Sequence, residues 1–184
     1  MEDFEQMECK ELQVGDLVKC VSDQTFPSDI IMLASSAEGD CFIATSSLDG
    51  EKNLKKRVKA KDLDQRIRTH LGKDVKPEQN KASKLAKDLL AMKGKLECEA
   101  PDKNLHRFVG KLVFTDRTPE HNVILSEQQL LLKGANLKNT EWVVGICVYS
   151  GADTKIMMNS QQGQPKMSHL ESQINKLVIS IIIV

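Results

Sequence analysis

The sequence predicts a mainly β fold with one helical insertion and a C-terminal helix that enters a membrane. Short apolar or β-branched runs, separated by turn residues, fill positions 12–48 and recur over 95–149. A lysine-rich, aromatic-poor stretch, 52–95, interrupts them, and the last eight residues, 177–184, are almost wholly apolar. With 184 residues, 40% hydrophobic and 28% charged, the chain has room for one ordinary domain and an appendage.

The expected strands follow from the apolar runs and the turns between them. In chain order they lie at 17–21, 30–34, 41–45, 95–98, 108–114, 130–134 and 142–149. The turns before the insertion lie at 26–29, 38–40 and 49–51, the last with glycine in its centre. The run 30–34 is continuously apolar, which is typical of a strand buried on both faces. The longest run, 142–149, is the expected central strand.

The insertion holds one expected amphipathic helix, at 79–92, with loose polar sequence before it. Five apolar residues recur there at helical spacing: Ala82, Leu85, Ala86, Leu89 and Leu90.

A second helix is expected to begin near Ser168, because Ser168 and Glu171 have the spacing of a capping box. A membrane span needs roughly 20 apolar residues, so the shorter apolar run at the end suggests that the chain stops inside a membrane helix. These patterns divide the chain into an N-terminal lead-in, a main domain that contains the insertion, and a linker with the start of a transmembrane helix. The three parts are 1–11, 12–160 (insertion 52–95) and 161–184.

Charge and cysteine content exclude several classes of function. Lys+Arg and Asp+Glu are both 26, so the net charge of zero gives no argument for a nucleic-acid partner. The five cysteines are widely spaced without a CxxC pair, and the four histidines are scattered. This favours reduced thiols in a cytosolic setting over disulfides or zinc. We expect no cofactor or metal site in this chain, and its acidic first residues do not resemble a signal peptide.

Several ordered blocks resemble one family. They read VGDLV at 14–18, FPSD at 26–29, TSSLDGEKNLK at 45–55, CE at 98–99, NL at 104–105, FVG at 108–110, LLKG at 131–134, LKNT at 137–140 and GADTKIMMN at 151–159. Their order and spacing are similar to the actuator domain of P-type ATPases of type IV, the phospholipid-translocating flippases. An isolated Asp-Gly-Glu is no more than a solvated turn, and the region 56–92 matches poorly. The specificity comes from the ordered set.

The resemblance implies a distorted jelly-roll-like domain on the cytoplasmic side of an integral membrane pump. It assigns three catalytic-loop residues, Asp49, Gly50 and Glu51, to dephosphorylation of an aspartyl phosphate held by another domain. Glu51 would activate the attacking water, Gly50 would allow close approach to the phosphate, and Asp49 would hold the turn through backbone N–H groups. The family usually has threonine where this chain has Lys52. In an extended loop Lys52 would face away from Glu51. If Lys52 instead faced the phosphate, its positive charge would attract the phosphate.

The partners that the resemblance implies are the phosphorylation and nucleotide-binding domains of the same pump, the transported phospholipid and an accessory subunit. ATP and Mg²⁺ would be bound by the full pump, not by this segment, which lacks an Asp-Lys-Thr-Gly phosphorylation site. Two alternatives stay open. One is a catalytically inert interaction module with the same fold. The other is the actuator domain of a cation pump, against which Asp49 and the pattern over 131–159 argue.

The remaining features have ordinary structural interpretations. Trp142 is expected in the core, and 151–159 is expected to be a structural turn in which Thr154 and Asn159 bond the backbone. A basic cluster is either a solvated face or a surface for anionic headgroups or a phosphorylated domain. Its members are Lys52, Lys55, Lys56, Arg57, Lys59 and Lys61.

Overall fold

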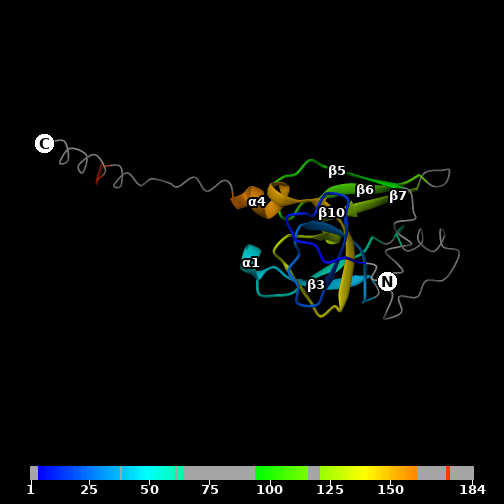
Figure 1. The fold of residues 1–184 in the computed structure, drawn as a ribbon, viewed down its shortest axis with the longest axis horizontal. Helices are drawn as coiled ribbons and strands as arrows, with labels where there is room; N and C mark the ends of the chain where they lie inside the picture. The colour runs from blue at the N-terminus through cyan, green and yellow to red at the C-terminus, as the bar shows by residue number, and fades with distance from the viewer. Residues whose placement is uncertain are drawn as a thin grey trace.

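The computed structural model describes residues 4–37, 39–60, 62–63, 94–115, 121–160 and 173–174. These residues form a mainly β fold, as predicted (Figure 1). The strands are β1 (Leu17–Val21), β2 (Asp29–Ser35), β3 (Asp40–Ala44), β4 (Lys55–Val58), β5 (Gly94–Cys98), β6 (Val109–Phe114), β7 (His121–Ser126), β8 (Leu130–Leu131), β9 (Asn136–Lys138) and β10 (Trp142–Tyr149). The helical elements are α1 (Ser46–Asp49), η1 (Glu127–Gln129), η2 (Gly151–Asp153) and α4 (Lys155–Ser160).

The strands form three antiparallel sheets with the largest one in the middle. Its order is β1-β10-β2-β8, and the two smaller sheets have the orders β4-β3-β9 and β5-β6-β7. In Figure 1 the labels β5, β6 and β7 lie on one side of β10, and β3 and α1 lie on the other. The small sheets therefore cover opposite faces of the middle sheet.

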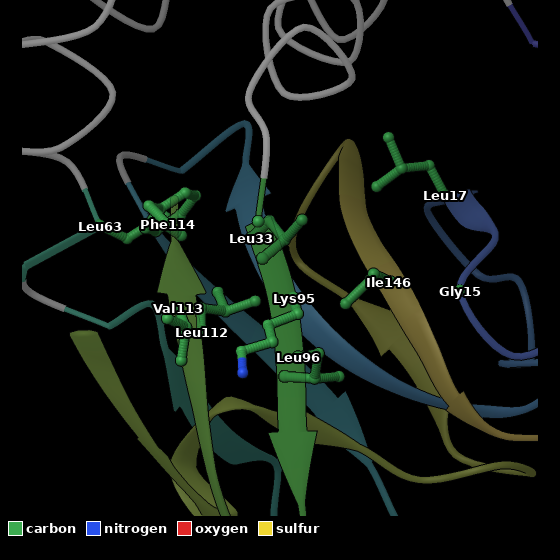
Figure 2. Close-up of a pocket in the computed structure, with 11 residues that line it drawn as sticks. Gly15, Leu17, Leu33, Leu63, Lys95, Leu96, Leu112, Val113, Phe114 and Ile146 are labelled. Atoms are coloured by element: carbon green, nitrogen blue, oxygen red, sulfur yellow. The ribbon is translucent and has the colours of Figure 1, made fainter. Parts of the chain in front are cut away.

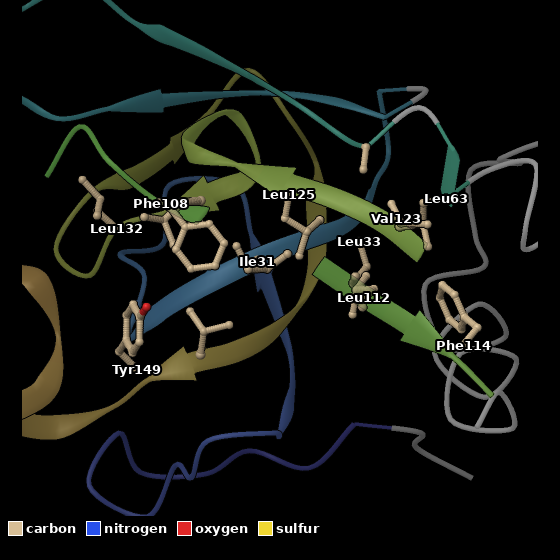
Figure 3. Packing of buried hydrophobic residues seen from close by; sticks show 13 residues of the cluster. Ile31, Leu33, Leu63, Phe108, Leu112, Phe114, Val123, Leu125, Leu132 and Tyr149 are labelled. Carbon is tan, nitrogen blue, oxygen red and sulfur yellow. The ribbon is translucent and has the colours of Figure 1, made fainter. Parts of the chain in front are cut away.

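Strand β2 is apolar on both of its faces because each face packs against a different small sheet. All seven of its residues are buried. Ile31 and Leu33 pack into a cluster with residues of β6 and β7, which Figure 3 shows from close by. Ile30 and Met32 belong to a second cluster, with residues of β3 and β9. Because successive side chains of a strand point to opposite faces, a strand between two packed layers needs a continuous apolar run.

The longest strand, β10, has the inner position that its sequence predicts. It pairs with β1 on one side and with β2 on the other. Trp142, its first residue, is buried and packs with Ala34 and Val144. Both expectations are confirmed.

Several boundaries differ from the prediction. The expected loose polar sequence after residue 52 contains β4, an antiparallel partner of β3; its lysines suit a strand at the end of a sheet. Strands β7 and β9 were not predicted, although β7 alternates cleanly between exposed Asn122 and Ile124 and buried Val123 and Leu125. The expected strand at 130–134 shortens to β8, because Gly134 turns the chain at φ 86°.

The stretch 151–159 is only partly a turn, because η2 leads directly into α4. The expected side-chain bonds are present. Thr154 Oγ1 donates to the Gly151 carbonyl oxygen at 3.0 Å, and Asn159 Nδ2 donates to the carbonyl oxygens of Lys103 and Lys155 at 2.6 and 3.2 Å. The bond from Asn159 to Lys103 ties α4 to the loop after β5.

Two expected helices fall outside this description. The insertion helix at 79–92 lies outside the described residues, as does most of the C-terminal helix, of which only Gln173 and Ile174 are described, both helical. Among the described residues, no helix combines the length and apolar character that a membrane crossing requires.

Candidate functional site

The Asp-Gly-Glu residues form a tight loop at the end of β3. A single helical turn, α1, follows β3 and ends at Gly50, whose φ is 76° and whose N–H donates to the Ser46 carbonyl oxygen at 3.2 Å. A left-handed backbone at this point favours glycine, because a Cβ atom strains it. The loop therefore reverses directly before Glu51.

The loop is anchored to the core from beneath. Ser47 Oγ donates to the Gly134 carbonyl oxygen at 2.9 Å. Leu48 packs against both large core clusters. A Cβ atom on Gly134 would lie 3.1 Å from Leu48 Cδ2, so the two segments are in close contact. The Gly134 turn thus supports α1 from below.

A buried carboxylate fixes that supporting turn. Asp29 is fully buried. Its Oδ1 accepts the Lys133 N–H and its Oδ2 accepts the Lys155 N–H, both at 2.8 Å. Burial raises the pKa of Asp29, and the two backbone bonds act in the opposite direction. Asp29 therefore joins the turn below the acidic loop to the start of α4, and this role was not foreseen from the sequence.

Asp49 has both carboxylate oxygens occupied inside the loop. Its Oδ1 accepts the Glu51 N–H at 3.0 Å, as predicted for a residue that holds the turn. Thr45 Oγ1 lies 3.1 and 3.0 Å from the two oxygens, and Lys55 Nζ donates to Oδ2 at 2.6 Å. The hydrogen bond from Lys55 is the main cause that lowers the pKa of Asp49 to about 2. Asp49 is an internal acceptor that shapes the loop.

Glu51 projects outward instead. Its side chain is 61% exposed, and Lys55 Nζ lies 3.0 Å from its Oε2. Within the part of the chain that the structure describes, no hydrogen bond is recorded to Oε1. Glu51 can therefore reach a group outside this domain, and Oε1 is available to accept a proton.

Lys55 is the site residue that sequence reasoning missed. Lys52 lies nearer to Glu51 in the sequence. It is exposed, however, and among the described residues it forms no ion pair with Glu51. The part of the loop that precedes Glu51 is not extended, because it consists of α1 and a left-handed glycine. The available signal was that Lys55 is the last residue of the block TSSLDGEKNLK at 45–55.

The basic cluster does not form one face. Lys55 turns toward the acidic loop, whereas Lys56, the next residue of β4, pairs with Asp40 at 2.6 Å. Arg57 is half-buried, and burial lowers its pKa. Lys61 lies outside the described residues. The cluster therefore splits into separate local contacts.

A metal site and a ligand pocket are two other kinds of site that could accompany the loop. The described residues contain no group of three or more His, Cys, Asp or Glu side chains that could hold a metal ion. Figure 2 shows a pocket between the middle sheet and the β5–β6 pair, where apolar side chains predominate. None of its lining residues belongs to the acidic loop, so it contributes nothing to that site.

The fold and the loop define a class: a β-rich domain that presents one exposed carboxylate at the tip of a hydrogen-bonded loop. Known proteins resemble this chain at the level of sequence. A scan against protein-family models finds no match. The human protein named phospholipid-transporting ATPase IG is 34% identical over 174 residues, which are 94% of this chain and 14% of that protein.

Two further relatives are also named as phospholipid-transporting ATPases. Phospholipid-transporting ATPase IH of Mus musculus is 34% identical over 172 residues (92% of this chain, 13% of the relative). Probable phospholipid-transporting ATPase 7 of Arabidopsis thaliana is 33% identical over 180 residues (97% and 13%). The chain is homologous to a segment of the phospholipid-transporting ATPases, the P4-type class. It spans about one seventh of the length of these relatives.

Proposed function

We propose that this chain is the actuator-domain segment of an ATP-driven phospholipid-translocating pump, with the distorted jelly-roll-like fold of that domain. Its acidic loop would promote dephosphorylation of an aspartyl-phosphate intermediate. One observation carries the proposal: Glu51 stands exposed at the tip of a loop that Gly50, Asp49 and the Gly134 turn hold rigidly. A carboxylate on such a support can be delivered to a reacting group in another domain without first being ordered.

The proposed chemistry is hydrolysis of an acyl phosphate. A water molecule attacks phosphorus while Glu51 accepts its proton as general base. The bond between phosphorus and the aspartyl oxygen breaks, and its electron pair stays on the aspartate carboxylate. Inorganic phosphate leaves, and the covalent intermediate is resolved. Asp49 and Gly50 act indirectly, by shaping the loop.

The rest of the pump belongs to the same proposal. The proposed domain spans 12–160, with the insertion 52–95, between a lead-in at 1–11 and a linker with the start of a transmembrane helix at 161–184. It works on the cytoplasmic side of an integral membrane protein against the phosphorylation and nucleotide-binding domains. ATP and Mg²⁺ are assigned to those domains of the full pump, because the relatives are named as ATPases. Phospholipid is the transported substrate, and an accessory subunit is a further partner.

The test is a chimera in which this chain replaces the matching segment of a P4-type ATPase. The phosphoenzyme is formed with labelled ATP, formation is stopped, and its decay is followed in wild-type and Glu51→Gln chimeras. Because a positioned general base contributes about 100-fold or more, we expect Glu51→Gln to slow decay by about that factor. The phosphoenzyme should still form, since its formation takes place in other domains.

Glu141→Gln is the matched control, because Glu141 is an exposed glutamate in the turn before β10, outside the acidic loop. We expect it to decay like wild type. Equal decay of the Glu51 and Glu141 variants would support the alternative of a catalytically inert interaction module.

A further inference from the structure

The acidic loop contacts a cation to which the proposed dephosphorylation step assigns no role. Lys55, the first residue of β4, lies 2.6 Å from Asp49 Oδ2 and 3.0 Å from Glu51 Oε2 through a single ammonium group. We propose that Lys55 is a positioning residue for dephosphorylation: it joins the two carboxylates into one rigid unit and cancels part of their charge when the loop meets a phosphoryl group. This inference rests on the function proposed above.

Lys55 reduces the electrostatic repulsion between the loop and its target. The tip of the loop carries two carboxylates, Asp49 and Glu51, and its target, a phosphoryl group, is also anionic. Like charges repel at the short distances that a reaction requires, and the repulsion grows as water is excluded. One ammonium in contact with both carboxylates offsets much of this repulsion. The phosphate would then meet a group with one net negative charge in place of two.

Lys55 also holds the Glu51 carboxylate in one direction. Lys55 occupies one oxygen of each carboxylate, and for Glu51 this is Oε2. The other oxygen, Oε1, has no recorded hydrogen bond within the described residues, so Lys55 can orient the carboxylate without blocking it. A base has to be held within hydrogen-bond reach of the proton that it accepts. A side chain fixed at Oε2 meets this need better than one that rotates freely.

Folding stability alone does not account for the contact of Lys55 with both carboxylates. The Lys55 and Glu51 side chains are 22% and 61% exposed, and ion pairs that reach solvent contribute little to folding. The loop is already anchored by Ser47, Leu48 and the left-handed Gly50. The lysine therefore matters most for how the loop presents its charge.

Lys56 provides a matched control on the next position of the same strand. It is also a lysine in an ion pair, but its partner is Asp40, at 2.6 Å, outside the loop. Lys55→Met and Lys56→Met remove the same charge from neighbouring positions. Lys55→Arg keeps the charge and offers several donors for two carboxylates.

The experiment compares Lys55→Met, Lys55→Arg, Lys56→Met and Glu51→Gln in the chimeric pump by phosphoenzyme decay, at low and at high ionic strength. We expect Lys55→Met to slow decay about tenfold, equivalent to about 1.4 kcal/mol of barrier. We expect Lys56→Met to match wild type and Lys55→Arg to recover most of the rate. The Lys55→Met defect should shrink as salt screens the repulsion, which a merely structural defect would not do.

A second readout uses the 184-residue chain itself. Titration of carboxyl groups by NMR should show the Asp49 pKa, held at about 2, returning toward its ordinary value of 3.8 in Lys55→Met and not in Lys56→Met. Two results would overturn the inference. One is equal decay of the two methionine variants while Glu51→Gln remains slow, which leaves the proposed function standing. The other is normal decay of Glu51→Gln, which removes both.

Discussion

Two lysine–aspartate pairs in this domain have the same chemistry and opposite surroundings. Lys55 lies 2.6 Å from Asp49 at the tip of the acidic loop, where both side chains reach solvent. Lys155, at the start of α4, lies 2.5 Å from Asp102, but its own side chain is completely buried. Its ammonium also faces the Tyr149 ring, 5.8 Å from the ring centroid.

The difference lies in what each pair can contribute. In contact with water, an ion pair replaces hydration by an interaction of similar strength, so its net effect on stability is small. A buried ammonium has lost its hydration, and the protein has to supply the compensating charge. We therefore interpret the Lys155–Asp102 pair as part of the folded scaffold that holds α4, and the Lys55–Asp49 pair as part of the working surface.

The largest expected effect comes from breaking the buried pair on its exposed side. Asp102→Asn keeps a hydrogen-bond acceptor but removes the carboxylate charge that pairs with the buried Lys155 ammonium. We expect the free energy of unfolding to fall by about 3 kcal/mol, measured by urea denaturation of the 184-residue chain. Lys155→Met should cost less, because Asp102 is 35% exposed and can be hydrated when the lysine is gone.

Asp23→Asn is the control for that variant. Asp23 pairs with Lys138 at 2.5 Å, but the two side chains are 72% and 39% exposed. We expect its loss to change stability by less than about 0.5 kcal/mol. If the Asp102 and Asp23 variants unfolded at the same urea concentration, burial would not be what separates the pairs.

A smaller effect is expected from the backbone of the acidic loop. Gly50→Ala places a Cβ atom on a residue at φ 76°, and open space surrounds that atom, so the cost is conformational rather than steric. We expect a loss of about 1 kcal/mol in the free energy of unfolding. Gly50→Asn should cost less, because asparagine tolerates this conformation. Equal stability of all three proteins would mean that the loop relaxes away from the left-handed turn.

How far the sequence predicts this site depends on the distance over which each contact acts. The Asp49 turn, the freedom of Gly50 and the outward direction of Glu51 follow from local residues. Strand β2 follows equally well, since a short, continuous apolar run between two turns is typical of a strand buried on both faces. The support of the loop by Gly134 and by buried Asp29 joins positions about 100 residues apart, and nothing local indicates it.

Lys55 is the instructive intermediate case. It lies four residues from Glu51, but the polar stretch around it was interpreted as loose sequence rather than as β4. Only when β4 pairs with β3 does the side chain of Lys55 turn toward the loop while that of Lys56 turns toward Asp40. A missed edge strand therefore led to a missed site residue.

The smallest expected effect is the loss, at acid pH, of the stability that the Lys55–Asp49 pair contributes. In the folded chain the Asp49 pKa is about 2, below its ordinary value of 3.8. The folded state therefore holds its proton less tightly than the unfolded state. The stabilisation from the pair is complete above about pH 4 and disappears as the pH falls through about 2. Because the pair reaches solvent, we expect it to be worth less than about 1 kcal/mol at neutral pH.

The measurement is urea denaturation of wild type, Lys55→Met and Lys56→Met from pH 7 to pH 2. Lys55→Met should be slightly less stable than wild type at neutral pH and equal to it at pH 2. The difference between the two proteins cancels the titration of other acidic groups, including Asp102, whose pKa is also lowered by a lysine. A difference that stayed constant across this range, or that grew with acid, would mean that Lys55 stabilises the fold through packing and not through the charge of Asp49.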